Sequence, residues 1–148
     1  MINAPFNLQR FVNAQKPIYD SVVQELKSGK KRSHWMWFVF PQISGLGASV
    51  TAEKFALSNR SEAIAYLKHP LLGQRLKECT QIVVDLNDVT ADFIFGYPDV
   101  LKFRSCMTLF DAVNQETDVF QLALQKYFDG RPDRLTLDIL KQKGESSD

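Results

Sequence analysis

The chain has 148 residues, of which 45% are hydrophobic and 24% charged, a composition typical of a domain that buries its own core without disulfides or metal. A net charge of +1 excludes a strong overall field, so binding to a nucleic-acid polymer or a membrane surface is not expected. The longest apolar run, residues 35–40, is far shorter than the roughly 20 residues that span a bilayer, and no signal core follows the N-terminus. We therefore expect a cytoplasmic protein with one domain over residues 1–142 and a disordered tail over residues 143–148.

The first helices are predicted from polar caps, apolar residues at intervals of three or four, and Gly or Pro stops. Asn7 is placed to cap a first helix, and Pro17 begins either a kink or a second helix that runs to residue 27. Gly29 then supplies the left-handed conformation that ends this helix.

Residues 35–40 form a continuous apolar run, which fits a buried strand or a buried helical segment. A lone strand would have no partner for its backbone in a chain of helices. We therefore expect one or two helical turns that are mostly buried and end before Pro41.

The same signals predict the remaining helices, with Ser61, Thr90, Thr117 and Asp133 as caps. The expected ranges are 61–69, 71–85, 90–96, 98–113, 118–128 and 133–142. The connections are short and no repeat period is visible. The predicted fold class is therefore all-α, a single compact multihelical domain of about seven or eight helices.

Five blocks occur in the order RFVNAQ, KSGKKRSHWMWFVFPQISGLGASVTAEKFAL, YLKHPLLGQRLKEC, IFGYPDVLKFRSCMTLFDAV and LQKYFDG. With these blocks the chain closely resembles, over about residues 8–140, a bacterial family known as domain of unknown function 1810. The resemblance implies a compact multihelical fold and no established activity. Some members carry the label "calpastatin", but calpain inhibitors of that name are disordered, whereas the composition here predicts a packed core.

Residues 30–34, KKRSH, place three cations and a histidine directly before a tryptophan. Cations after a helix end can simply stabilise its negative C-terminal pole. Alternatively, Arg32 offers a planar fork to a phosphate or carboxylate, and Ser33 adds a hydroxyl. His34 is the candidate catalytic acid or base if it lines a cleft, and a hydrogen-bonded core histidine is the plainer interpretation.

Trp35 and Trp37 point to different sides of their segment, so at most one can stack on a planar ligand, and packing in the core is the default for both. Gln42 begins a loop in which Gly45 and Gly47 either let a backbone approach an anion or form an ordinary turn. This G-x-G pattern lacks the preceding strand and the third glycine of a dinucleotide-binding site.

Arg104, Ser105 and Thr108 lie within one turn of an expected helix, so a cation and a hydroxyl can share one face and bind an anion. Alternatively, Arg104 forms a structural ion pair with an acidic side chain. The candidate partners are Asp99, Asp111, Glu62 and Glu78.

Metal and redox chemistry are not indicated. Cys79 and Cys106 have no C-x-x-C spacing and lie among apolar residues, which predicts buried, reduced thiols. Two separate histidines and two isolated cysteines do not make a zinc site, so we expect no metal and no cofactor.

The leading functional hypothesis is a protein that binds an anionic, nucleotide-like small ligand between the three candidate segments. The alternatives are a non-catalytic protein–protein interaction module and an enzyme that acts on a phosphate-bearing ligand. Convergence of Arg32, His34, Gln42 and Arg104 in one pocket would favour a ligand site, whereas their dispersal would favour a scaffold.

Overall fold

The computed structural model describes residues 6–114 and 116–147, with side chains described as far as residue 143. Over these residues the fold is all-α, as predicted, and its one β-type contact is an isolated parallel bridge between Ile43 and Leu57. The helices of this part of the chain are α1 (Gln9–Gln15), α2 (Tyr19–Lys27), α3 (Met36–Val39), α4 (Val50–Lys54), α5 (Arg60–Lys68), α6 (Leu72–Asp85), α7 (Ala91–Phe95), α8 (Asp99–Val113), α9 (Val119–Phe128) and α10 (Arg134–Ser147). The count exceeds the prediction because short helices such as α4, with five residues, carry too few apolar positions to show a repeat.

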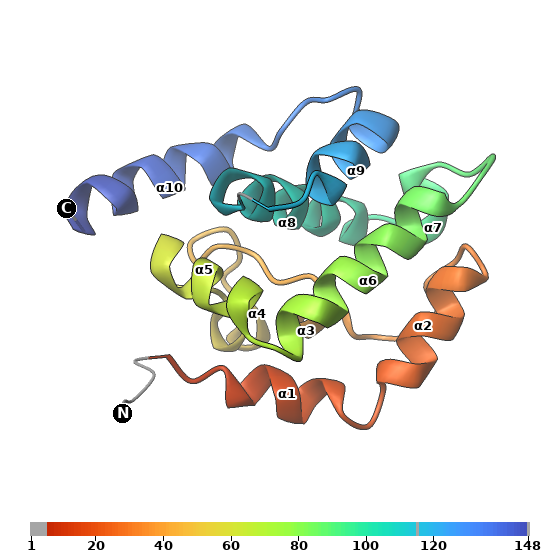
Figure 1. Cartoon of the computed structure of the whole chain (residues 1–148), viewed down its shortest axis with the longest axis horizontal. Coiled ribbons are helices and arrows are strands. Elements are labelled where there is room, and N and C mark those ends of the chain that lie inside the picture. The colour runs from red at the N-terminus through yellow and green to blue at the C-terminus, as the bar shows by residue number, and fades with distance from the viewer. Residues whose placement is uncertain (1–5, 115, 148) are drawn as a thin grey trace.

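Helix α8 is the centre of the molecule. It packs against α3, α5, α7, α9 and α10, and in Figure 1 it lies between α9 and α10 on one side and α5 on the other. Its residues 105–110 are all buried, including both hydroxyl side chains among them. Because this stretch of α8 is buried on every side, the other helices form a layer around it.

The run at residues 35–40 is confirmed as helical and mostly buried. Trp35 is 2% exposed and Phe40 fully buried, while Trp37 and Phe38 at the centre of α3 are half-buried. The Phe40 ring meets the Phe103 ring of α8 edge to face, with centroids 5.1 Å apart. This short helix therefore anchors the N-terminal half of the chain on α8.

Helix ends agree only in part with the predicted caps. The side chains of Thr90 and Asp133 accept backbone hydrogen bonds as expected, from Phe93 N–H at 3.1 Å and Thr136 N–H at 3.1 Å. Helix α5 is capped by Asn59 instead of Ser61, because Asn59 is extended and its Oδ1 accepts from Glu62 N–H at 2.9 Å.

Two further helix ends differ from expectation. Helix α1 starts after Leu8, without a side-chain cap, so Asn7 does not have the predicted role. Helix α10 continues to Ser147, past the end expected near residue 142 and into the range for which a disordered tail is predicted. Within it, Lys143 Nζ donates to the Ser58 carbonyl at 2.8 Å, which ties this part of α10 to the start of α5.

Gly73 sets how closely α5 and α6 approach. It lies in the first turn of α6, and a Cβ atom there would be 1.9 Å from the carbonyl oxygen of Leu67 in α5. Because this oxygen belongs to the backbone, it cannot move aside without displacing the helix. The turn between α5 and α6 therefore requires a glycine at position 73.

We predict that Gly73→Ala lowers the free energy of unfolding by about 2–3 kcal/mol, because the added methyl group forces the two helices apart. Urea unfolding followed by circular dichroism measures the change. The control is Gln74→Ala, at the neighbouring exposed residue. Its free energy of unfolding should stay within about 0.5 kcal/mol of that of the parent protein. A Gly73→Ala variant as stable as the control would contradict the close approach.

Candidate functional site

The cation-rich turn between α2 and α3 is organised by an internal carboxylate, Glu25 of α2. Its Oε1 accepts hydrogen bonds from Arg32 N–H at 2.6 Å, Ser33 N–H at 3.1 Å and Trp35 Nε1–H at 2.9 Å, and its Oε2 accepts from the Ser33 hydroxyl. Burial by itself would raise the pKa of Glu25, but these hydrogen bonds outweigh it and lower the pKa to about 2. The Ser33 hydroxyl and the backbone donors of this turn are thus occupied by the protein's own anion.

The cations of this turn are also paired or exposed. Lys31 Nζ lies 2.8 Å from the carboxylate of Asp99 in α8, and Lys102 Nζ lies 2.9 Å from its other oxygen. Burial alone would raise the pKa of Asp99, but the two ammonium groups lower it. The Arg32 guanidinium is exposed and donates to Ser28 Oγ at 3.0 Å, while His34 is exposed. This turn therefore offers an external anion little beyond the exposed Arg32.

Trp37, Gln42 and Gly47 come together, but around a cavity of only about 10 Å³. Such a space holds at most about one water molecule. A Cβ atom on Gly47 would lie 2.7 Å from that of Ala52, so this glycine is required for packing, and Gly45 is required for its φ of +109°. These residues pack a loop and leave no room for a ligand.

Arg104, Ser105 and Thr108 do share one face of α8, and together they hold residues 131–133 at the start of α10. The Arg104 guanidinium donates to the carbonyls of residues 131 and 132, at 2.9 and 3.2 Å. The Thr108 hydroxyl accepts from Asp133 N–H at 2.8 Å, and the Ser105 hydroxyl donates to the Asp133 carboxylate at 3.2 Å. Backbone carbonyls, and none of the acidic side chains considered above, are thus the partners of Arg104.

The residues chosen from the sequence therefore do not form one pocket. Arg32 contacts α2, Gln42 lines the small cavity beside α4, and Arg104 holds the start of α10. His34 is exposed at the surface turn. Arg32, Gln42 and Arg104 therefore mainly make contacts within the protein, in three separate places.

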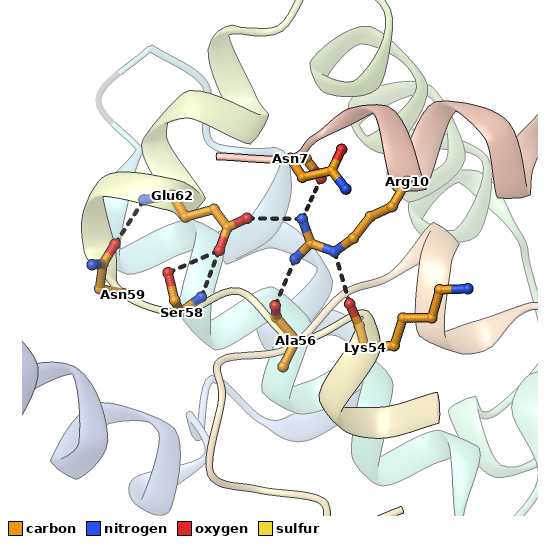
Figure 2. Close-up of polar contacts among 7 residues, drawn as sticks. All are labelled: Asn7, Arg10, Lys54, Ala56, Ser58, Asn59 and Glu62. Carbon is orange, nitrogen blue, oxygen red and sulfur yellow. Dashed lines mark hydrogen bonds and ion pairs between the residues drawn. The ribbon is translucent and has the colours of Figure 1, made fainter. Parts of the chain in front are cut away.

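A partly buried ion pair between Arg10 and Glu62 was not predicted from the sequence (Figure 2). The guanidinium of Arg10 donates to the carbonyls of Lys54 and Ala56, at 2.7 and 2.9 Å, and to the carboxylate of Glu62 at 3.1 Å. Glu62 also accepts from Ser58 N–H and Oγ–H, at 2.7 and 2.9 Å. The pair ties α1 to α5 and to the loop after α4, and the partners lie 52 residues apart, so no local pattern announces it.

The thiols are confirmed as free and buried. Burial raises the pKa of Cys79 to about 12 and that of Cys106 well above its ordinary value. Both side chains are therefore protonated at neutral pH, which disfavours nucleophilic or redox chemistry.

A much larger groove, of about 880 Å³, lies where α5 ends, α6 begins and α8 ends. Its apolar lining consists of Ile64 and Leu67 from α5 and Val113 from α8, all half-buried. Cationic lining comes from Lys68, the last residue of α5, and Lys77 on α6. None of these residues was proposed from the sequence as part of a site.

His69 also lines this groove and caps α6 with its imidazole ring. Its Nδ1 lies 3.2 Å from the backbone nitrogens of both Leu71 and Leu72 and accepts from their N–H groups. A neutral imidazole that accepts at Nδ1 carries its hydrogen on Nε2. The sequence marked this position only as a helix end before proline.

Two further properties concern the described part of the chain. No group of three or more His, Cys, Asp or Glu side chains there is placed to hold a metal ion. None of its helices combines the length and the apolar character needed to cross a membrane.

Comparison with known proteins places the chain among uncharacterised relatives. A family model described as "Protein of unknown function (DUF1810)" matches residues 5–140. The crystal structure of the conserved hypothetical protein Rv1873 from Mycobacterium tuberculosis is similar, with a TM-score of 0.92 and 50% sequence identity, over 93% of this chain and 99% of that one. No match is found among the curated proteins.

We predict that stability depends on the ionised form of Glu25. Its pKa falls from an ordinary 4.5 to about 2 on folding, so its contribution is complete above pH 4.5 and is lost as the pH falls toward 2. Glu25→Gln should therefore cost roughly 1–2 kcal/mol at pH 6, and this gap should close by about pH 2. Urea unfolding at several pH values measures it.

The control for this experiment is Glu53→Gln, at an exposed residue of α4. Its difference from the parent protein should be small and nearly constant over the same pH range. A gap for Glu25→Gln that does not change between pH 6 and pH 2 would mean that the carboxylate charge does not organise the turn.

Proposed function

Since the chain belongs to the DUF1810 family, whose description names no activity, we propose from its own geometry that it is a binding protein that holds a small ligand in the groove between α5, α6 and the end of α8. The general hypothesis of a small-ligand protein is kept, and its site moves away from the KKRSH turn. The proposal rests mainly on the groove itself.

The volume of the groove supports this proposal. Sites for small molecules in proteins commonly enclose about 300–1,000 Å³. The groove has about 880 Å³, whereas the cavity lined by Trp37, Gln42 and Gly47 has about 10 Å³. Apolar walls that carry a few polar groups are the usual composition of a ligand site.

A catalytic role receives less support from the side chains that could perform it. The hydroxyl of Ser33 is donated to Glu25, and that of Ser105 to Asp133. Arg32 and Arg104, the charge clamps of the enzyme hypothesis, contact different elements. Binding without chemistry therefore needs fewer assumptions.

An interaction module remains the second candidate because three large apolar side chains that are close in sequence are exposed. Phe93, Tyr97 and Leu101, at and around the junction of α7 and α8, are 53%, 82% and 49% exposed. Large apolar side chains that stay exposed together often mark contact surfaces. We call these three residues the aromatic patch.

A thermal-shift screen of the purified protein against a metabolite library tests the proposal. A ligand present at about 100 times its Kd stabilises by about 2.7 kcal/mol, which for a domain of this size raises Tm by roughly 5–10 °C. The compound should be recovered chemically unchanged.

A variant with a narrowed groove is the matched comparison. Ile64→Trp should abolish the shift, whereas Leu135→Trp, at an exposed site on α10, should retain it. A compound that stabilises both variants equally would place its site elsewhere, and a compound converted to product would replace the binding function with an enzymatic one.

A further inference from the structure

We infer that the ligand of the groove is a small organic anion with an aromatic or other apolar body, and that Lys68, Lys77 and the Nε2–H of His69 bind its anionic group. This inference rests on the proposed function and adds the chemical class of the ligand. It follows from the charges, the donor and the apolar wall of the groove.

The two lysines of the groove differ from those of the KKRSH turn. Lys31 of that turn forms an ion pair with Asp99, which also pairs with Lys102 of α8. Lys68 and Lys77 form no ion pair with any carboxylate in the described part of the chain, although both line the same groove. Lys68 also stabilises the C-terminal pole of α5, but Lys77 lies inside α6 and is half-buried, so helix-end chemistry does not explain it.

His69 adds a donor whose direction is fixed by the backbone. Because Nδ1 accepts from the N–H groups of Leu71 and Leu72, the ring hydrogen lies on Nε2, which forms no hydrogen bond within the residues described. A ligand that meets Nε2 must therefore present an acceptor. A carboxylate, phosphate or sulfonate oxygen suits both this donor and the ammonium groups that line the same groove.

The apolar wall explains why the ligand is more than an inorganic ion. Ile64, Leu67 and Val113 present half-buried hydrocarbon to the groove, and a ligand body that covers it gains free energy from burial. Glu116 also lines the groove, and its negative charge opposes an anion. Removal of that charge should therefore strengthen binding, which is a directional test of the inference.

The probe for this test is 8-anilinonaphthalene-1-sulfonate, a fluorescent aromatic anion, titrated at low salt into the native full-length protein. Its uncharged counterpart is N-phenyl-1-naphthylamine. We expect saturable binding of the anion that weakens as salt is added, weaker binding of the neutral compound, and chemical-shift changes at the amides of Leu67 and Gln74.

The charge variants have defined expectations. Lys68→Gln and Lys77→Gln should each raise the Kd of the anion about threefold to tenfold, and Glu116→Gln should lower it about twofold to fivefold. Lys27→Gln is the matched control, because Lys27 is the last residue of α2 as Lys68 is of α5. It should leave Kd unchanged.

His69→Asn separates recognition from folding. An asparagine side chain can still accept the N–H groups at the start of α6, so Tm should stay nearly constant, but its amide N–H groups end short of the position of the His69 Nε2–H donor. The expected result is a Kd raised about threefold with an unchanged Tm. A Kd equal to that of the parent protein at an equal Tm removes His69 from the site.

Three outcomes overturn the inference. The first is equal affinity in the parent, Lys68→Gln and Lys77→Gln proteins, and the second is equal affinity for the charged and neutral probes. The third is loss of the fluorescence in Phe93→Ser, which would place the probe at the aromatic patch, where Lys30 Nζ lies 4.8 Å from the ring centroid of Phe93.

Failure of this inference is distinguishable from failure of the proposed function. A library compound that stabilises the parent but not Ile64→Trp, and binds the lysine variants equally well, supports the function and rejects the anion chemistry. If the Kd of the probe changes as expected in the charge variants but no library compound stabilises the protein, the proposed function is rejected and the anion chemistry of the groove is supported.

Discussion

Because α8 is enclosed by α3, α5, α7, α9 and α10, each polar side chain on its buried faces must be satisfied by another element of the protein. Arg104, Ser105 and Thr108 meet this requirement by holding residues 131–133, which fixes where α10 begins. The N-terminal end of α8 pairs Asp99 with two lysines, and its C-terminal end supplies Val113 to the groove. One buried helix thus determines both the packing around it and the position of the concave surface.

Internal carboxylates explain why the most conspicuous stretch of the sequence is chiefly structural. A dense group of cations and donors attracts an anion, but the nearest anions are Glu25 and Asp99 of the same chain. Folding brings them close at high effective concentration, whereas an external ligand loses translational freedom when it binds. A cluster of donors in a sequence therefore indicates a carboxylate partner before it indicates a ligand.

The fold was largely predictable because its signals are local. Caps such as Thr90 and Asp133 act within three residues, and the stop at Gly29 with φ of +82° depends on the glycine itself. Apolar density also identified residues 35–40 as buried. Features that depend on contacts across the chain were not predictable, and the Arg10–Glu62 ion pair is an example, because its partners lie 52 residues apart and neither segment indicates the other.

The candidate site was less predictable for a related reason. Arg, Trp, His and Gly drew attention to the KKRSH turn and its neighbours, but residue type does not reveal whether a partner already exists. In the sequence, Lys68, His69 and Lys77 belong to ordinary helical patterns. They become candidate site residues only in the fold, where they line one groove with the end of α8. The sequence shows which side chains could bind an anion. Only the fold shows which of them are not already bound to another part of the protein.

The fixed orientation of the His69 ring affects how selectively the groove would bind a ligand. The orientation of the ring is set by two backbone amides at the start of α6, where Gly73 lets α6 approach α5 closely. The donor is therefore preorganised, since little rotamer freedom remains to be lost on association, in contrast to a lysine ammonium at the end of a flexible stem. Selectivity at this surface would then reside mainly in the direction of one N–H bond, with the lysines contributing attraction over a wider range of ligand positions.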